Sequence, residues 1–244
     1  MPRFFIDRPV DREETNIIID GEDGRHIERS LRMAAGEEIA VCDSNEQEHF
    51  CKITSIQNGV VTAEILYSQP CKNEASIKVT LYQALTKGDK MDTIIQKAVE
   101  LGVFKIVPVV TKRCVSRPDQ KSLMKKCQRW QKIAQQAAMQ SHRGIIPEIG
   151  EPLDFKKALE QCKENSKNIL FYEKGGEKIS DSRIKDIESL GIFIGSEGGF
   201  DPEEVSEFLK TGGTTATLGK RILRAETAPL AALTIIMYET GNMD

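Results

Sequence analysis

The feature that most constrains this chain is a change of rhythm near residue 77. From there onward, short apolar runs alternate with longer segments in which apolar residues recur at helical spacing. Short buried strands that alternate with helices indicate a mostly parallel sheet covered by helices on both faces, so we expect an α/β domain. Its strands are predicted at 79–84, 106–110, 169–172, 191–195 and 214–218, and its helices at 90–101, 121–140, 154–162, 181–189, 202–211 and 226–238.

The first 70 or so residues follow a different pattern, with short strands around one helix. Asn58 and Gly59 form a dipeptide typical of a tight hairpin turn, and Gly36 ends the predicted helix. The strands are predicted at 3–6, 16–20, 38–42, 49–56 and 60–67, and the helix at 23–33. This pattern predicts a small β-barrel. Because a polar linker with Pro70 follows, we expect two domains, 1–72 and 73–244.

Composition excludes several classes of protein. A hydrophobic fraction of 39% over 244 residues is enough for a real core. The longest apolar run, 228–238, is shorter than the ~18 residues of a membrane span, and the charged N-terminus lacks the apolar stretch of a secretory signal. The six cysteines include no C-x-x-C pair and the three histidines supply no close ligand pairs. We therefore expect a cytoplasmic protein with reduced thiols, no metal site and no membrane partner.

The formal net charge of −3 hides a strong segregation of charge along the chain. Residues 1–75 carry 8 basic and 15 acidic side chains (−7), residues 76–147 carry 14 and 4 (+10), and residues 148–244 carry 12 and 18 (−6). The basic stretch is the pattern expected for contact with a phosphate backbone, although a solvated lysine-rich helix face would have the same composition.

Polar and glycine-rich loops follow two of the predicted strands, where ligands of such sheets bind. In the segment GSEGGF (195–200), Gly198 and Gly199 allow a sharp bend and a close approach to a ligand. Asp201 and Pro202 then provide the cap and first residue of a helix. A purely structural turn would explain the glycines, whereas Glu197 favours a functional loop.

The second loop, LGKRILRAETA (218–228), does not fit the standard nucleotide motifs. Thr214 and Arg221 occupy the positions where a phosphate-binding loop requires Gly and Ser or Thr, and no G-x-G-x-x-G follows any strand. The backbone groups of this irregular loop need partners, which the edge of an adenine would supply. Packing alone explains Ile222 and Leu223 equally well.

Two further stretches carry polar groups that simple packing does not explain. The helix predicted from residue 90 has a regular apolar face, but Lys87, Gln96 and Glu100 are not needed for it. The segment AAMQSHR ends another predicted helix, and its His142 is more typical of a surface or capping residue than of a base.

In this order, the segments KGDKMDTIIQKAVELGV, AAMQSHRGIIP, IGSEGGFDPEE and LGKRILRAETA resemble the motifs of the RsmE-type ribosomal RNA methyltransferases. RFFI and HIERSLRMAAGEEI are similar to the small PUA-like barrel of that family, so the resemblance covers nearly the whole chain. It implies methylation of N3 of a uridine in 16S ribosomal RNA of the small subunit. It also implies the SPOUT fold, in which a trefoil knot is formed by the C-terminal strands of the mostly parallel sheet, and a homodimer with the site at or near the subunit interface.

The resemblance further implies S-adenosylmethionine as cofactor and S-adenosylhomocysteine as product. The residues expected to bind the cofactor are Tyr172, Ile194, Gly195, Glu197, Gly198, Gly199, Leu218, Gly219, Ile222 and Leu223. Contacts with RNA are expected from Arg3, Arg8, Arg25, Arg29, Arg32, Lys87, Lys112, Arg113, Arg117 and Arg143. Arg25, Arg29 and Arg32 recur at i, i+4 and i+7, which aligns them on one face of the predicted helix.

Methyl transfer to N3 of uracil needs a base and a cation, because this nitrogen carries a proton and its lone pair is delocalised. Glu197 is a candidate base, Arg224 a candidate for stabilising charge on O2 or O4, and Glu226 a second carboxylate. A helix cap explains Glu226 as well. Two alternatives stay open: a SPOUT enzyme that acts on another RNA, and a non-catalytic RNA-binding or ribosome-assembly protein.

Overall fold

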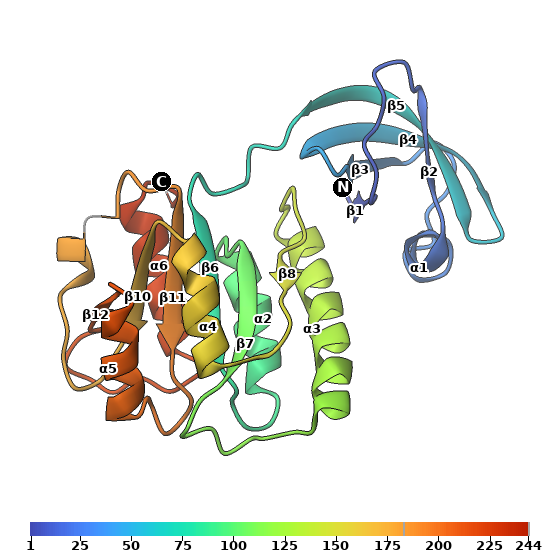
Figure 1. Ribbon diagram of the computed structural model, residues 1–244. Coiled ribbons are helices and arrows are strands. Elements are labelled where there is room, and N and C mark those ends of the chain that lie inside the picture. The colour runs from blue at the N-terminus through green and yellow to red at the C-terminus, as the bar shows by residue number, and fades with distance from the viewer. Residues whose placement is uncertain (183, 244) are drawn as a thin grey trace. The chain divides into compact units, whose positions relative to one another are not determined.

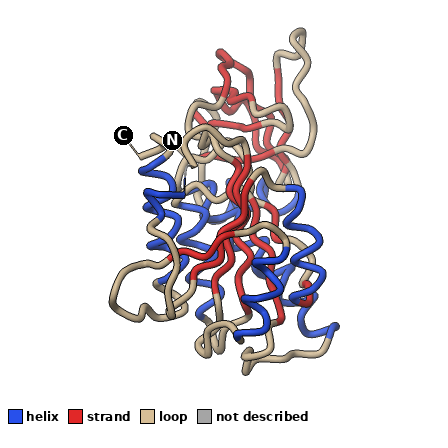
Figure 2. Tube along the Cα trace, turned by 60° about the vertical axis from the view of Figure 1, so that its left-hand side comes forward, coloured by secondary structure: helices blue, strands red, loops and turns tan. Residues whose placement is uncertain are grey.

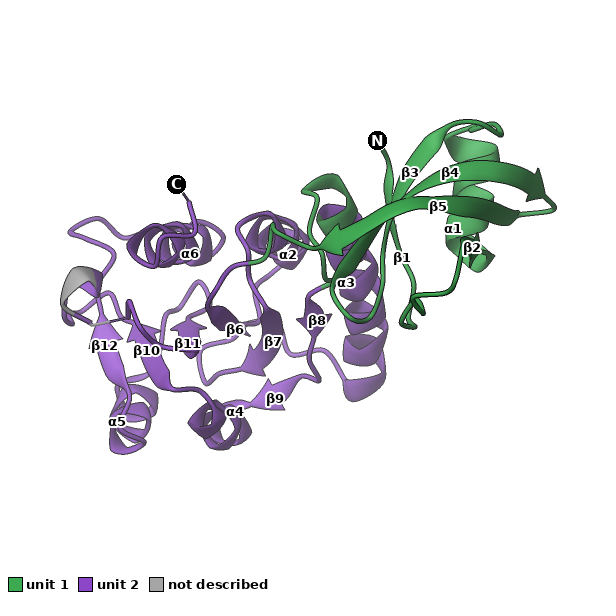
Figure 3. Cartoon of the chain, turned by 90° about the horizontal axis from the view of Figure 1, so that it is seen from above, with its two compact units in different colours: residues 1–74, 138–146 green, residues 75–137, 147–244 purple. Residues whose placement is uncertain are grey.

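The computed structural model describes residues 1–182 and 184–243, which form two compact units (Figure 3). The first comprises Met1–Glu74 and Ala138–Ile146, and the second Ala75–Ala137 and Pro147–Asp244. The segment 138–146, which we expected in the second domain, therefore belongs to the first unit. The reason is a set of contacts around Glu74, whose carboxylate accepts hydrogen bonds from the Arg143 guanidinium at 2.6 Å and from the Gly144 amide at 2.7 Å.

The first unit is built on a five-stranded sheet. Asn58 and Gly59 have φ values of 53° and 77°, so the predicted hairpin turn between its two long strands is confirmed. One face of the sheet covers a core that includes Phe4, Ile17 and Ile39. The strands are ordered β1-β3-β4-β5-β2, so the sheet ends at β1 and β2 instead of closing as a barrel. Their bounds are β1 Arg3–Phe5, β2 Asn16–Ile19, β3 Glu38–Cys42, β4 Gln47–Gln57 and β5 Val60–Pro70.

The prediction of a single helix over 23–33 is wrong. The structure has a short helix, α1 (Gly21–Arg25), that continues into a π-helical turn, His26–Ser30. Arg32 has a φ of 52°, which lies outside any right-handed helix. Because helical spacing is lost across the wider turn and at Arg32, the three arginines expected at i, i+4 and i+7 do not share one α-helical face.

The second unit contains the predicted mostly parallel sheet (Figure 1). Every ladder between its named strands is parallel, and β9 pairs with β7 beside the main path β12-β10-β11-β6-β7-β8. The bounds are β6 Lys78–Ala84, β7 Lys105–Val110, β8 Glu148–Ile149, β9 Leu153–Asp154, β10 Lys167–Phe171, β11 Ser189–Ile194 and β12 Thr214–Ala216.

Helices cover both faces of this sheet, as expected from the sequence. In Figure 3, α2 and α6 lie on one face and α4 and α5 on the other, and Figure 2 shows the same strands between helices. The bounds are α2 Lys90–Glu100, α3 Gln120–Gln140, α4 Phe155–Gln161, α5 Pro202–Lys210 and α6 Ala228–Glu239. None of the described helices is long and apolar enough to cross a membrane.

Two helix predictions differ from the structure. The helix predicted over 181–189 is not found in the described residues of that range. These residues form the end of a 3-10 turn (Ile179–Ser182), a loop and the start of β11. Arg183 lies outside the described residues. The last helix begins at Ala228 instead of residue 226, so Glu226 precedes it. Both misjudgements concern segments next to the loops at the carboxyl ends of the strands.

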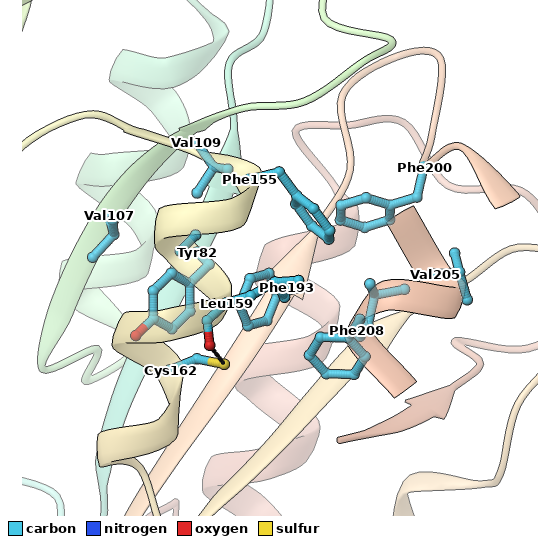
Figure 4. Packing of buried hydrophobic residues seen from close by; sticks show 12 residues of the cluster. Tyr82, Val107, Val109, Phe155, Leu159, Cys162, Phe193, Phe200, Val205 and Phe208 are labelled. Carbon is cyan, nitrogen blue, oxygen red and sulfur yellow. Dashed lines mark hydrogen bonds between the residues drawn. The ribbon is translucent and has the colours of Figure 1, made fainter. Parts of the chain in front are cut away.

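An aromatic cluster fixes α4 and α5 against the sheet (Figure 4). The Phe193 ring on β11 stacks on Tyr82 of β6 at a centroid distance of 4.4 Å and meets Phe208 of α5 edge-on at 5.1 Å. Phe155 of α4 approaches the same ring at 6.2 Å. Each such pair contributes about 0.5–1.5 kcal/mol beyond the area that it buries. The cluster therefore holds β11 rigidly just before the loop that follows it.

Candidate active site

Three loops meet at the carboxyl ends of the neighbouring strands β11, β10 and β12 and enclose a cavity of about 520 Å³. All residues that we expected to bind a cofactor line this cavity, and so does Arg224. Glu226 is not among its lining residues. The structure therefore brings together side chains and backbone from three distant segments: 171–173, 194–200 and 217–225.

The glycines of the loop after β11 leave the cavity open. Gly199 has a φ of 65°, and its amide donates to the carbonyl of Ser196 at 2.9 Å to close a tight turn. A Cβ at Gly195 would stand 3.0 Å from Gly199, and one at Gly199 would stand 3.1 Å from the carboxylate oxygens of Glu173. The backbone thus forms a surface on which side chains have no room.

The helix after this loop starts with strong local signals. The Asp201 side chain accepts from the Glu203 amide, and the Glu204 carboxylate accepts from the Asp201 amide, which completes a capping box before Pro202. Such a box satisfies backbone donors that otherwise lack partners. The predicted helix start is confirmed, and it sets where the loop after β11 ends.

Lys90, at the start of α2, joins the two candidate carboxylates. Its Nζ lies 3.1 Å from Oε1 of Glu197 and 3.1 Å from Oε2 of Glu226. The Lys87 amide also donates to Oε1 of Glu197, at 3.2 Å. We did not single out Lys90 from the sequence, although it lies in the KGDKMD segment, because only the fold brings α2 beside the loop after β11.

These contacts keep the cluster ionised. Hydrogen bonds to Glu197 and then Glu226 raise the pKa of Lys90. Burial pushes the pKa of Glu197 upward, but hydrogen bonds from its own amide, the Lys87 amide and Lys90 outweigh burial and lower it. Its own amide and then Lys90 lower the pKa of Glu226, with a further contribution from the charge of Arg224. Both carboxylates therefore carry negative charge at neutral pH.

Arg224 is the candidate cation among the residues that line the cavity. It is exposed in the loop before α6, and its side chain makes no hydrogen bond or ion pair within the described part of the chain. Ile222 in the same loop is 85% exposed, which is unusual for a large apolar side chain at a cavity. A cation and an apolar side chain are thus both available to a bound molecule.

Arg113, a predicted RNA contact, instead supports the loop after β11. Its guanidinium donates to the carbonyl of Gly198 at 3.2 Å and to Asp201 at 3.4 Å, and its own carbonyl accepts from the Ser196 hydroxyl at 3.2 Å. These contacts tie both ends of the glycine turn to the segment after β7. Arg113 therefore has a structural role at the cavity that the sequence did not indicate.

Two other predicted RNA contacts are corrected by burial. Arg3 and Arg143 are 6% and 3% exposed. Arg3 is paired with Glu48, and Arg143 with Glu74, so both charges are neutralised inside the first unit. Neither arginine presents its charge on the surface, and we leave both out of the proposed RNA contacts. The other predicted contacts are exposed: Arg8, Arg25, Arg29, Arg32, Lys87, Lys112 and Arg117.

Comparison with known proteins decides the family. Residues 73–237 match the model of a family described as an RNA methyltransferase domain, and residues 19–66 match an RNA methyltransferase PUA domain. The ribosomal RNA small subunit methyltransferase E of Bacillus subtilis is 35% identical, with 98% of this chain and 97% of that protein covered. The protein of the same name from Mesomycoplasma hyopneumoniae is also 35% identical, with 96% and 98% covered. The chain belongs to the ribosomal RNA small subunit methyltransferase E family.

A solved structure of the family has the same fold. The ribosomal RNA small subunit methyltransferase E of Neisseria gonorrhoeae, bound to S-adenosyl methionine, is 32% identical and superposes with a TM-score of 0.88 over 98% of this chain and 97% of that one. Family membership accounts for the small N-terminal β-sheet domain and the α/β domain. In the described residues, no group of three or more His, Cys, Asp or Glu side chains is placed to hold a metal ion.

Proposed function

We propose that this chain methylates N3 of a uridine in 16S ribosomal RNA of the small subunit, in the cytoplasm, with S-adenosylmethionine as methyl donor. The observation that carries the proposal is the cavity at the carboxyl ends of three parallel strands, lined by the residues expected to bind the cofactor. The family relative from Neisseria gonorrhoeae, which has the same fold, is described with S-adenosyl methionine bound.

The cavity suits this cofactor in size and chemistry. Its volume of about 520 Å³ lies within the ~300–1,000 Å³ typical of small-molecule sites. Glycine backbone offers amides and carbonyls at close range, while Ile194, Leu218, Ile222 and Leu223 offer apolar surface. When bound, S-adenosylmethionine supplies an electrophilic methyl group and leaves as S-adenosylhomocysteine.

The residues of the chain supply the proton transfer and the charge stabilisation. N3 of uracil must lose its proton, and the negative charge then spreads onto O2 and O4. Glu197 is our candidate base because its ionised carboxylate lines the cavity, and Glu226 is the alternative on the other side of Lys90. The unpaired guanidinium of Arg224 is suited to the developing charge on the uracil oxygens.

We also propose that the C-terminal strands form the trefoil knot of the SPOUT class. Ala216 of β12 accepts a hydrogen bond from the amide of Tyr172, at the end of β10, at 3.0 Å. On its other side, β12 pairs with Glu177, whose amide donates to Thr215 at 2.9 Å and whose carbonyl accepts from Thr217 at 3.1 Å. Glu177 lies in the connection from β10 to β11. Contacts on both sides of β12 support passage of the chain through this connection.

A homodimer is our further proposal, and α6 supports it. This helix buries Ala232, Leu233 and Ile236 against the sheet, while Ile235 and Tyr238 on other faces are 37% and 67% exposed. An apolar helix that still exposes large side chains is typical of surfaces that a second subunit covers. The proposed partners are thus small-subunit RNA and a second copy of the chain.

A methylation assay with nucleoside analysis tests the proposed function. Purified protein and S-adenosylmethionine are incubated with small subunits or free 16S ribosomal RNA that lack the modification. We expect N3-methyluridine, and strong loss of turnover in Arg224→Ala with cofactor binding retained. Methylation of a ribose or of transfer RNA would instead support a different SPOUT enzyme. No heat of binding on titration with S-adenosylmethionine would favour a non-catalytic RNA-binding protein.

A further inference from the structure

Two of the six cysteines, Cys42 and Cys71, lie side by side in the first unit. Cys42 is the last residue of β3, and Cys71 comes directly after β5. The Cys71 amide donates to the carbonyl of Glu46, the residue before β4, at 2.9 Å and so continues the pairing of β5 with β4. The two sulfur atoms lie 3.9 Å apart, within hydrogen-bond distance. The other four cysteines have no such thiol partner among the described residues.

The surroundings make this pair chemically different from an ordinary buried thiol. Nη1 of the buried Arg3 donates to the Cys42 sulfur at 2.9 Å. The Cys71 thiol and then the Arg3 charge lower the pKa of Cys42, whereas the same sulfur–sulfur hydrogen bond and burial raise the pKa of Cys71. The Arg3 guanidinium thus favours the thiolate form of Cys42, and the Cys71 thiol donates to that sulfur.

The two sulfurs also differ in access. Cys42 is fully buried, whereas Cys71 is partly exposed. A small oxidant can therefore reach Cys71, and Cys42 lies behind it in position to react next. A solvent-accessible thiol next to a second, resolving thiol is an arrangement found in redox-sensitive cysteines.

We propose that Cys42 and Cys71 form a reversible intramolecular disulfide when the protein meets a peroxide. The accessible Cys71 sulfur attacks an oxygen of hydrogen peroxide and loses its thiol proton, so that an S–O bond forms, the O–O bond breaks and hydroxide leaves. The Cys42 sulfur then attacks the Cys71 sulfur, the S–S bond forms, the S–O bond breaks and a second hydroxide leaves. The two thiol protons convert both hydroxides to water, and the peroxide takes up the two electrons.

The disulfide would join three segments of the first unit at one point. In the reduced protein, Arg3 of β1 donates to both the Cys42 sulfur and the carbonyl of Arg143, at 2.9 and 3.1 Å. Cys71 packs directly on Gly144, where a Cβ would come within 2.4 Å of the Cys71 Cβ. Oxidation replaces the hydrogen bond between the sulfurs by a covalent link and removes the ionisable thiol beside Arg3.

The full-length protein tests this directly. Reduced protein is treated with hydrogen peroxide and then denatured. The free thiols that react with N-ethylmaleimide are counted. We expect the count to fall from six to four and to return to six with dithiothreitol. Digestion at glutamate separates Cys42 from Cys51, because Glu46 and Glu48 lie between them, so mass spectrometry identifies the linked pair.

The variants make the assignment specific. Cys42→Ser and Cys71→Ser each abolish the linked peptide, whereas the matched control Cys51→Ser retains it, since burial raises the pKa of Cys51 to about 12 and leaves that thiol inert. The oxidised wild type is also expected to unfold several degrees higher than the reduced form, because the link closes a loop spanning 29 positions. Six thiols after oxidation, a link through Cys51 or a link between two chains would each overturn the proposal.

Discussion

At the scale of single residues, Lys90 organises the site more than either carboxylate that it binds. The side chains of Lys90, Glu197 and Glu226 are 31%, 27% and 32% exposed, and ion pairs as solvated as these contribute only about 0–1 kcal/mol to folding. The cluster therefore does little for stability. Its effect is to hold the Glu197 carboxylate at the cavity in one ionised position.

Removal of the ammonium tests this positioning role. In Lys90→Met, we expect turnover to fall by up to about 100-fold, because small displacements of a reacting group have effects of that size. The acidic limb of the pH–rate profile should move to higher pH, because loss of Lys90 removes one of the causes that lower the pKa of Glu197. Both effects are measured by steady-state methylation at several pH values.

Lys97→Met is the matched control for that variant. Lys97 lies on the same helix, and its Nζ pairs with Glu100 at 2.8 Å, away from the residues that line the cavity. If Lys97→Met lost as much activity as Lys90→Met, or if the pH–rate profile of Lys90→Met were unchanged, Lys90 would have no positioning role.

At the scale of elements, the loop after β11 depends on backbone that only glycine adopts without strain. Gly199 and Gly212 both have positive φ, at 65° and 87°. A Cβ at Gly199 would crowd the Glu173 carboxylate at 3.1 Å, whereas one at Gly212, after α5, would meet nothing within 4 Å. The two glycines therefore separate the effect of strain alone from the effect of occupying space at the cavity.

Alanine substitution at these two positions distinguishes the effects. Each change costs about 1–2 kcal/mol for left-handed backbone, so both variants should unfold at lower temperature. Only Gly199→Ala should weaken S-adenosylmethionine binding, by about tenfold, which corresponds to ~1.4 kcal/mol. Calorimetric titration gives both affinities. Equal affinities would show that the space above Gly199 is not used by the cofactor.

At the scale of the whole molecule, charge is segregated by segment. Residues 76–137 of the second unit carry 13 basic and 4 acidic side chains, a net of +9 within a chain of net −3. Several of these cations are used internally: Arg113 supports the glycine turn, Arg129 pairs with Asp92, and Lys90 holds two carboxylates. Lys121, Lys125 and Lys126 on α3 are exposed and remain available for phosphate.

Charge reversal on α3 tests this surface. Lys121→Glu combined with Lys125→Glu should weaken binding of 16S ribosomal RNA and reduce the slope of log affinity against log salt by about 1–2, since each lost phosphate contact removes about one counterion. The matched control is Lys156→Glu with Lys157→Glu on α4, also an exposed pair. An equal loss of affinity in both double variants would mean that the RNA responds to net charge alone.

The sequence predicted those features that depend on local hydrogen bonding and on the period of apolar residues. Five strands of the parallel sheet, the Asn58-Gly59 turn and the capped start of α5 follow from neighbouring residues, and their positions are confirmed. The two-residue strands β8 and β9 were not predicted. The loops after β11 and β12 were predicted for the same reason, because each follows a strand that could be recognised from its own residues, whereas Tyr172 was expected only from the family resemblance. Where local signals were weak, at 23–33 and 181–189, the predictions were wrong.

Only the tertiary structure decided which charged and reactive side chains meet. Lys90 is brought to Glu197 and Glu226, and Cys42 to Cys71, by the packing of segments that are far apart in the chain. The segment 138–146 joined the first unit because the Glu74 carboxylate binds it. The sequence shows that a residue is basic but does not show whether its side chain faces phosphate or pairs inside a domain. Burial alone separated Arg3 and Arg143 from the exposed cations. Periodicity reports which face of an element is buried, but it does not report which distant residue that face meets.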